Sequence, residues 1–545
     1  MELKASNIET VRLDHLGIVA GICEELKIAE RVNSLIDVTD PRRKVTCGKA
    51  VVAMILNGLG FVGRALYMTP KFFANAPVQR LLGATITAEN LNDDSLGKAL
   101  DEIGDFGATE LYANVAFGIA MEHKLLGKTA HLDSTSMSME GEYSAKDPEA
   151  INIAYGFAKQ RPDLKQFVIQ MAVTGPADLP FWHEALDGNS SDKSSFVETI
   201  QTVEAFKKEL SSKVDFKWIA DSALYNKNSL LQLKDVLWIS RVPETITEAK
   251  ALISTYFSDE RWIEHSDGYK YVACKSNYGD VTQRWVLVYS REAYEREAAT
   301  FQKNLAKKQT ACEKELWHLE NRKFFCQKDA ELEFKKIAKN HEFFSISCTY
   351  EEEFKYSKKG RPTSMSQKTG IEWHAKPLFQ RNEMAIQEAL NTKGKFILAT
   401  NDLDATATPE GSLITEYKGQ QSVEKGFRFL KDPWFLSDKI FLKSQKRIEA
   451  LSMVMTLCLL VYNYAQYVIR SALKKENEAI PNQLGKLVQN PTMRWIFQIM
   501  AGISVVKVLP IVNGEIFEIV SNLTVLRNKI LVLLGPLVCT KYGIS

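Results

Sequence analysis

The sequence has few cysteines and none of the spacings that bind a structural metal. Its 8 cysteines are scattered over 545 residues without a Cys-x-x-Cys pair, which argues against a zinc site or a disulfide framework and favours a reducing compartment, the cytoplasm. An excess of one charge is also lacking, because 69 Lys and Arg residues nearly balance 67 Asp and Glu residues. Net charge therefore neither requires nor excludes nucleic-acid binding, which can depend on local basic patches.

Long apolar runs are scarce as well. Only residues 451–469 approach the length of a membrane span. Asn463 and Gln466 lie in the second half of this run, so we expect a core helix and no membrane partner, with a membrane anchor as the alternative. The N-terminus lacks the basic-then-apolar pattern of a secretion signal. Fixed-period repeats are not evident, which argues against solenoids and propellers.

The order of strand-like and helix-like patterns predicts an α/β protein in five parts. Residues 1–127 are expected to be helical. Residues 128–245 alternate strands with helices and indicate a mixed α/β layer. Residues 246–394 contain a hairpin and a long charged helix, and we interpret them as an α+β insertion. The α/β pattern resumes over residues 395–470, and residues 471–545 are expected to be helical again.

The strand and helix patterns of this layer can be placed more closely. Strands are predicted at residues 131–137, 166–173, 179–185, 216–220 and 236–240. Helices are predicted at residues 194–210 and 228–233. Asp133 lies in the first strand, and Asp221 follows the fourth. Ligands of open α/β sheets gather at the carboxyl ends of strands, although an aspartate there is often only a turn or N-cap residue.

A third acidic residue lies in a predicted helix over residues 413–431. At 100° per residue, a step of seven returns to nearly the same helix face. Tyr417, Glu424 and Lys431 are separated by seven and seven, so a phenol, a carboxylate and an ammonium would share one face. A solvated face with an ion pair between Glu424 and Arg428 is the alternative interpretation.

Basic residues are concentrated at two places. Residues 424–447 hold seven Lys and Arg residues, Lys425 and Arg428 among them, against three acidic residues. A loop in the insertion carries Lys358, Lys359 and Arg361. Such patches suit a phosphate backbone, although an exposed charge run is the common explanation for any one of them.

In their order along the chain, these residues resemble the DDE transposases of bacterial insertion sequences, specifically the insertion-sequence-four-like class. The resemblance rests on Asp133, Asp221 and the pattern Tyr417-x2-Gln420-x3-Glu424-x6-Lys431. Residues 156–166 and 188–192 are also similar to that class, and the resemblance covers roughly residues 130–470. Gln420 stands where the family has an arginine, which removes a positive charge from the motif but leaves the three carboxylates intact.

The resemblance implies a ribonuclease-H-like mixed-sheet catalytic core, interrupted by the insertion, that holds two Mg²⁺ or Mn²⁺ ions. Asp133 would bridge both ions, Asp221 would hold one and Glu424 the other. The ions would activate water, and then a DNA 3′-hydroxyl, for attack on a phosphodiester. His131 shares a strand face with Asp133, but oxygen is the ligand that Mg²⁺ prefers.

The resemblance also implies the partners. Tyr417, Gln420, Lys425, Arg428 and Lys431 would contact DNA, as would the loop with Lys358, Lys359 and Arg361. Residues 1–127 would bind the terminal inverted repeats, and two protomers would act together on the DNA ends and the target. Two alternatives stay open: a catalytically inactive DNA-binding relative, and a ribonuclease-H-like nuclease that cuts without joining.

Overall fold

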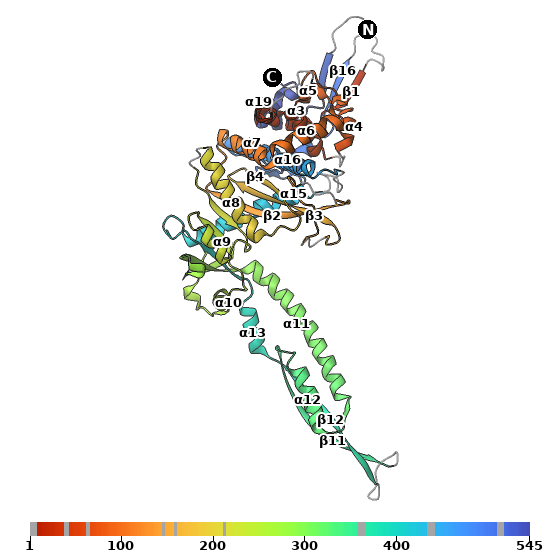
Figure 1. Ribbon diagram of the computed structural model, residues 1–545, viewed down its shortest axis with the longest axis vertical. Coiled ribbons are helices and arrows are strands. Elements are labelled where there is room, and N and C mark those ends of the chain that lie inside the picture. Colours follow the sequence, from red (N-terminus) through yellow and green to blue (C-terminus); the bar gives the residue numbers. More distant parts are fainter. Residues whose placement is uncertain are drawn as a thin grey trace. The chain divides into compact units, whose positions relative to one another are not determined.

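The computed structural model describes residues 8–36, 43–61, 66–143, 148–156, 161–210, 214–266, 268–357, 367–432, 442–508 and 517–544. The chain forms two compact units (Figure 1). The first unit comprises residues 1–240, 279–281 and 415–545, and the second comprises residues 241–278 and 282–414.

The N-terminal part of the first unit is mainly helical, as expected, but it begins with a strand, β1 (Ile8–Arg12). Thr46 caps the helix that begins at Cys47, because its side chain accepts a hydrogen bond from the backbone N–H of Lys49. The helices are α1 (Leu16–Glu25), α2 (Ile28–Leu35), α3 (Cys47–Leu59), α4 (Thr69–Phe73), α5 (Val78–Leu82), α6 (Asp93–Phe106) and α7 (Ala108–Glu122).

A mixed sheet forms the centre of the first unit. Its strands, in the spatial order β4-β3-β2-β5-β6, are β2 (Thr129–Met139), β3 (Lys165–Thr174), β4 (Leu179–Leu186), β5 (Lys217–Ala220) and β6 (Trp238–Arg241). The pairs β2–β3 and β3–β4 are antiparallel, whereas β2–β5 and β5–β6 are parallel. Helices α8 (Asp192–Glu209) and α9 (Lys227–Gln232) lie in the crossover connections. The predicted mixed-sheet α/β fold and its strand order along the chain are confirmed.

The long apolar run lies within α16 (Gln445–Lys475). Of the described helices, α16 alone is long and apolar enough to cross a membrane, with a mean hydropathy of 1.5 over its most apolar window. That window is 83% buried inside the protein, as expected for a core helix. It packs against α3, α6, α7 and β4, so it joins the N-terminal helices to the sheet.

The C-terminal region was expected to be helical, and this prediction is wrong in part. Helices α17 (Met493–Ile499), α18 (Val525–Leu534) and α19 (Pro536–Lys541) are present, but so are strands β14 (Ile480–Pro481), β15 (Leu487–Val488), β16 (Ser504–Val508) and β17 (Phe517–Ser521). Strand β16 pairs with both β17 and β1, with Val505 opposite Val11. The strand pattern was missed because its pairing partner lies at the other end of the chain.

The second unit contains two sheets. One has the strand order β13-β9-β8-β7 and the other β10-β12-β11. The strands are β7 (Ile263–Glu264), β8 (Tyr269–Ser276), β9 (Gln283–Ser290), β10 (Lys323–Phe324), β11 (Phe344–Tyr356), β12 (Lys368–Arg381) and β13 (Lys395–Thr400). The helices are α10 (Thr247–Ser254), α11 (Arg291–Glu320), α12 (Gln327–Ala338) and α13 (Glu383–Asn391). The predicted hairpin and the predicted long charged helix correspond to β8–β9 and α11.

Helices α11 and α12 lie along the β11–β12 hairpin (Figure 1). Two small apolar clusters hold them there. One is formed by Leu305, Cys312, Leu316, Phe344 and Ile386, and the other, which includes α12, by Leu319, Phe324, Ala330 and Ala375. The second unit therefore has a core of its own, separate from the large core of the first unit.

Candidate active site

Strand register brings two aspartates to adjacent positions in the sheet. In the parallel pair β2–β5, His131 lies opposite Ile219. Asp133 and Asp221 each lie two residues further along, and neighbouring strands are about 4.8 Å apart. Strand β5 ends at Ala220, so Asp221 begins the loop that follows it. The two aspartates therefore occupy neighbouring positions along two adjacent parallel strands.

Asp221 is held by its own loop. Its Oδ1 accepts a hydrogen bond of 2.8 Å from the backbone N–H of Ala223. Its backbone carbonyl accepts one of 2.7 Å from the Ser240 hydroxyl on β6. Burial, followed by the charge of Asp192, raises the pKa of Asp221 above its usual range, and the Ala223 N–H opposes that shift.

The helix predicted over residues 413–431 is not continuous. It is divided into α14 (Glu410–Lys418) and α15 (Gln421–Leu430). A Cβ atom at Gly419 would lie 2.6 Å from Cε1 of His131, so only glycine permits this close approach to β2. The side chain of Gln420 donates a hydrogen bond of 2.7 Å to the carbonyl of Leu132. Tyr417 lies on α14 and Glu424 on α15, so the two do not share one face of a single continuous helix.

Glu424 lies in the first turn of α15, one turn after Gln420. The buried side chains of this helix, which packs against β2 and β3, are Val423, Phe427 and Leu430. Glu424 itself is exposed. The helix thus holds Glu424 beside the strand that carries Asp133.

The pKa of Asp133 depends on the surrounding acids. Burial is the main cause that raises the pKa of Asp133 to about 7, and the charges of Asp221, Asp192 and Glu424 raise it further. The backbone N–H of Ser134 donates to Asp133 and opposes the shift. Segments that are distant from β2 in the sequence therefore place their carboxylates close enough to Asp133 to raise its pKa.

The fourth carboxylate of this group, Asp192, was not singled out from the sequence. It is the first residue of α8, and its Oδ1 accepts a hydrogen bond of 2.6 Å from the Ser134 hydroxyl. The segment 188–192 had been noted only for its resemblance to the transposase class. Aspartates are common at the start of a helix because they cap it, so the sequence position of Asp192 did not indicate a role in the site.

The three carboxylates are not gathered as tightly as the ligands of a single ion. Among the described residues, the oxygens of Asp133, Asp221 and Glu424 do not all lie within 4.8 Å of one another. Two ions about 4 Å apart, each about 2.1 Å from its ligands, allow ligand oxygens up to roughly 8 Å apart. The repulsion that raises the pKa of Asp133 is also the interaction that divalent cations would relieve.

His131 has a packing role in this structure. It is 7% exposed, and its ring lies against Gly419. Burial lowers its pKa to about 4, so the ring is neutral near pH 7. It supports the break between α14 and α15.

The expected DNA-contacting residues fall into three groups. Lys425, Arg428 and Lys431 are exposed near the carboxylates, and Tyr417 is half-buried. Gln420 is only 7% exposed and bonded to β2, so its expected DNA contact is replaced by a link between α15 and the sheet. The basic loop with Lys358, Lys359 and Arg361 lies outside the described residues.

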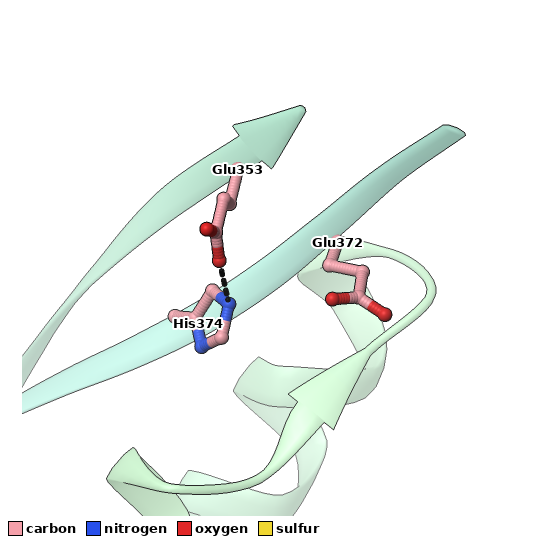
Figure 2. A group of neighbouring side chains, drawn as sticks. All are labelled: Glu353, Glu372 and His374. Carbon is pink, nitrogen blue, oxygen red and sulfur yellow. Dashed lines mark hydrogen bonds and ion pairs between the residues drawn. The ribbon is translucent and has the colours of Figure 1, made fainter. Parts of the chain in front are cut away.

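A second group of possible ligands lies on the β11–β12 hairpin (Figure 2). Glu353 faces Glu372 across the two strands, and Nε2 of His374 lies 3.0 Å from Oε2 of Glu353. Glu372, however, forms ion pairs with Lys323 at 2.7 Å and with Lys355. Both of its oxygens are thus already neutralised by ammonium groups, and we interpret the cluster as an ion-pair network.

Comparisons with known proteins add a partial match and a weak structural likeness. Residues 8–117 match the family model described as a domain of unknown function (DUF4277). No curated protein sequence matches the chain. A cryo-EM structure of the piggyBac transposase synaptic complex with hairpin DNA is similar over 90% of this chain and 82% of that chain, at 9% sequence identity and a TM-score of 0.36. A likeness at this level carries no argument about function, which must rest on the carboxylates themselves.

Proposed function

We propose that the protein is a DDE transposase that cleaves DNA at the ends of an insertion sequence and joins those ends to target DNA. One observation carries the proposal. Asp133, Asp221 and Glu424 come from distant parts of the chain, yet Asp133 experiences the charges of the other two. Acids that repel one another in a partly buried site have a stability cost, and divalent-cation chemistry is a physical reason to keep them.

Each carboxylate has a definable task in this chemistry. Two Mg²⁺ or Mn²⁺ ions, when bound, would activate the attacking oxygen and stabilise the leaving oxygen of the phosphodiester. Asp133, Asp221 and Glu424 would together hold these ions. Gln420 would fix the distance between β2 and α15, and hence between Asp133 and Glu424.

Basic residues next to the site suit the backbone of the DNA. Lys425, Arg428 and Lys431 are exposed on and just after the helix that carries Glu424, where they can bind phosphates. We further propose that residues 1–127 bind the terminal inverted repeats, that two protomers act on paired DNA ends, and that the reaction takes place in the cytoplasm.

The experiment is metal-dependent cleavage of labelled DNA taken from both flanks of the coding region. Glu424→Gln should reduce Mg²⁺-dependent cleavage by more than about 100-fold, because even defects outside the ligand shell can cost that much. It should not weaken DNA binding, because the substituted carboxylate repels phosphate and its removal takes away no attractive contact with the DNA backbone. Glu198→Gln, at an exposed position of α8, is the matched control and should cleave like the wild type.

The same assay separates the alternatives. Undiminished cleavage by Glu424→Gln would show that the metal site is assigned to the wrong residues. Binding without any cleavage by the wild type would indicate an inactive relative. Cleavage without transfer of labelled ends into a target plasmid would indicate a nuclease that cuts but does not join.

A further inference from the structure

We propose that a cavity in the first unit, separate from the carboxylate site, binds one unpaired nucleotide, with its base against aromatic side chains and its phosphate against basic ones. The cavity has a volume of about 770 Å³, and the residues that matter for binding are Arg12, His15, Phe61, Lys71, Arg494 and Phe497. This volume is in the range of small-ligand sites. A paired base inside a double helix cannot enter such a cavity, so the nucleotide must be unpaired. The proposal goes beyond the carboxylate site and does not depend on it.

Aromatic rings form one wall of the cavity. His15 and Phe497 are stacked, with ring centroids 4.2 Å apart and planes 19° from parallel. Phe61 lies 5.9 Å from Phe497 and 6.2 Å from His15. Nε2 of His15 lies 2.8 Å from the carbonyl of Leu59, and burial lowers the pKa of the ring. Phe497 is buried and supports the other two rings from behind, whereas His15 and Phe61 are half-buried. The wall is therefore uncharged near pH 7, and the exposed parts of His15 and Phe61 are flat surfaces of the kind on which a nucleobase stacks.

The backbone at Phe61 is strained. Its φ is 51°, a left-handed conformation that bulky side chains rarely adopt. Residues held in such conformations cluster at ligand-binding sites, where the surrounding structure maintains them. The strain places an aromatic ring at the cavity where an ordinary turn would place glycine or asparagine.

Basic side chains also line the cavity. Arg12, Lys71 and Arg494 outnumber Asp14, the one acidic residue of the lining. Arg12 pairs with Asp14 at 3.3 Å. Lys71 is exposed and has no ion-pair partner within the described parts of the chain. Because Arg494 is paired with Asp432, Lys71 supplies the positive charge that complements a phosphate group.

Arg494 also connects the cavity to the helix that carries Glu424. Its guanidinium lies 5.7 Å from the ring of Phe61 and 2.9 Å from a carboxylate oxygen of Asp432, which follows α15. A row of rings runs in the same direction, from Phe497 to Tyr462 at 6.0 Å and from Tyr462 to Phe429 of α15 at 4.8 Å. A strand whose unpaired nucleotide occupied the cavity would thus be held at the C-terminal end of α15.

The test is equilibrium binding of a fluorescent single-stranded oligothymidylate, measured by anisotropy with the full chain. Glu424→Gln in EDTA is used as the background, so that cleavage cannot occur and a wrong assignment of the catalytic site cannot affect the result. Lys71→Gln and Phe61→Leu should each weaken binding by at least about fivefold, from the loss of a phosphate contact and of base stacking. Lys98→Gln, an exposed lysine of α6, is the matched control and should bind like the background protein.

Two further measurements complete the test. Binding of a blunt duplex should be equal in all of these variants, because paired bases do not enter the cavity. Competition by free thymidine monophosphate identifies a site for free nucleotides, and its absence identifies a site for a nucleotide within a strand. The proposal is overturned if Lys71→Gln behaves like Lys98→Gln, or if the variants weaken duplex and single-strand binding equally. Lys71 is exposed, so Lys71→Gln should fold normally. It therefore tests the proposal even if Phe61→Leu fails to fold.

Discussion

Replacing Gln420 by alanine should loosen the attachment of α15 to the central sheet. The side chain is 7% exposed and donates a hydrogen bond of 2.7 Å to the carbonyl of Leu132. Losing that bond costs about 1 kcal/mol net. The space left by the buried amide adds to this cost because the surroundings relax only in part. We expect a total loss of about 2 kcal/mol in the free energy of unfolding.

Gln421→Ala is the control for this experiment. The neighbouring glutamine is exposed, and substitutions at such positions usually change stability by less than about 0.5 kcal/mol. The assay is amide hydrogen exchange of peptides that cover β2 and α15. Each 1.4 kcal/mol corresponds to a factor of ten. At amides that exchange only when the first unit unfolds, Gln420→Ala should therefore speed exchange by roughly 30-fold.

The same variant has a functional readout. Glu424 follows Gln420 by one helical turn, so a loosened α15 should lower metal-dependent cleavage by about 10- to 100-fold, as for defects that misplace a ligand. Cleavage by Gln421→Ala should not change. Equal exchange and equal cleavage in the two variants would refute the view that Gln420 holds α15 against β2.

Further predictions concern the pH dependence of stability, the metal and the helix break. The pKa of Asp133 is raised from its usual 3.8 to about 7, so the folded state keeps a proton that the unfolded state releases. The free energy of unfolding should therefore fall as pH rises from about 4 to 7 and then level off. Asp133→Asn should lack this slope and, without metal, be about 1–3 kcal/mol more stable than the wild type at pH 8; parallel slopes in thermal unfolding would contradict this. At the same pH, Mg²⁺ should raise the unfolding temperature of the wild type but not that of Asp133→Asn, because ligands stabilise the state that binds them. Gly419→Val should cost about 1–3 kcal/mol through its clash with His131, whereas Gly370→Ala, where a Cβ meets nothing within 4 Å, should not.

Local patterns were sufficient to predict the strands of the sheet and the residues at their ends. The run that became β3 is mostly apolar, and Asp221 directly follows a strand that is mostly apolar, so each could be identified without knowledge of its neighbours. The helix break could not, because it depends on the contact between Gly419 and His131, which are far apart in the chain. The sequence position of Gln420 suggested a DNA contact, but its hydrogen bond to Leu132 could not be predicted for the same reason, because it is visible only in the folded chain.

Helix α16 has a consequence for how this protein is made. The helices of residues 8–117 bury apolar side chains against it, and β1 finds its partner strand in β16. During translation these early helices leave the ribosome hundreds of residues before the surfaces that cover them. We expect the nascent chain to need chaperones until its last hundred residues emerge, and residues 8–117 expressed alone to aggregate.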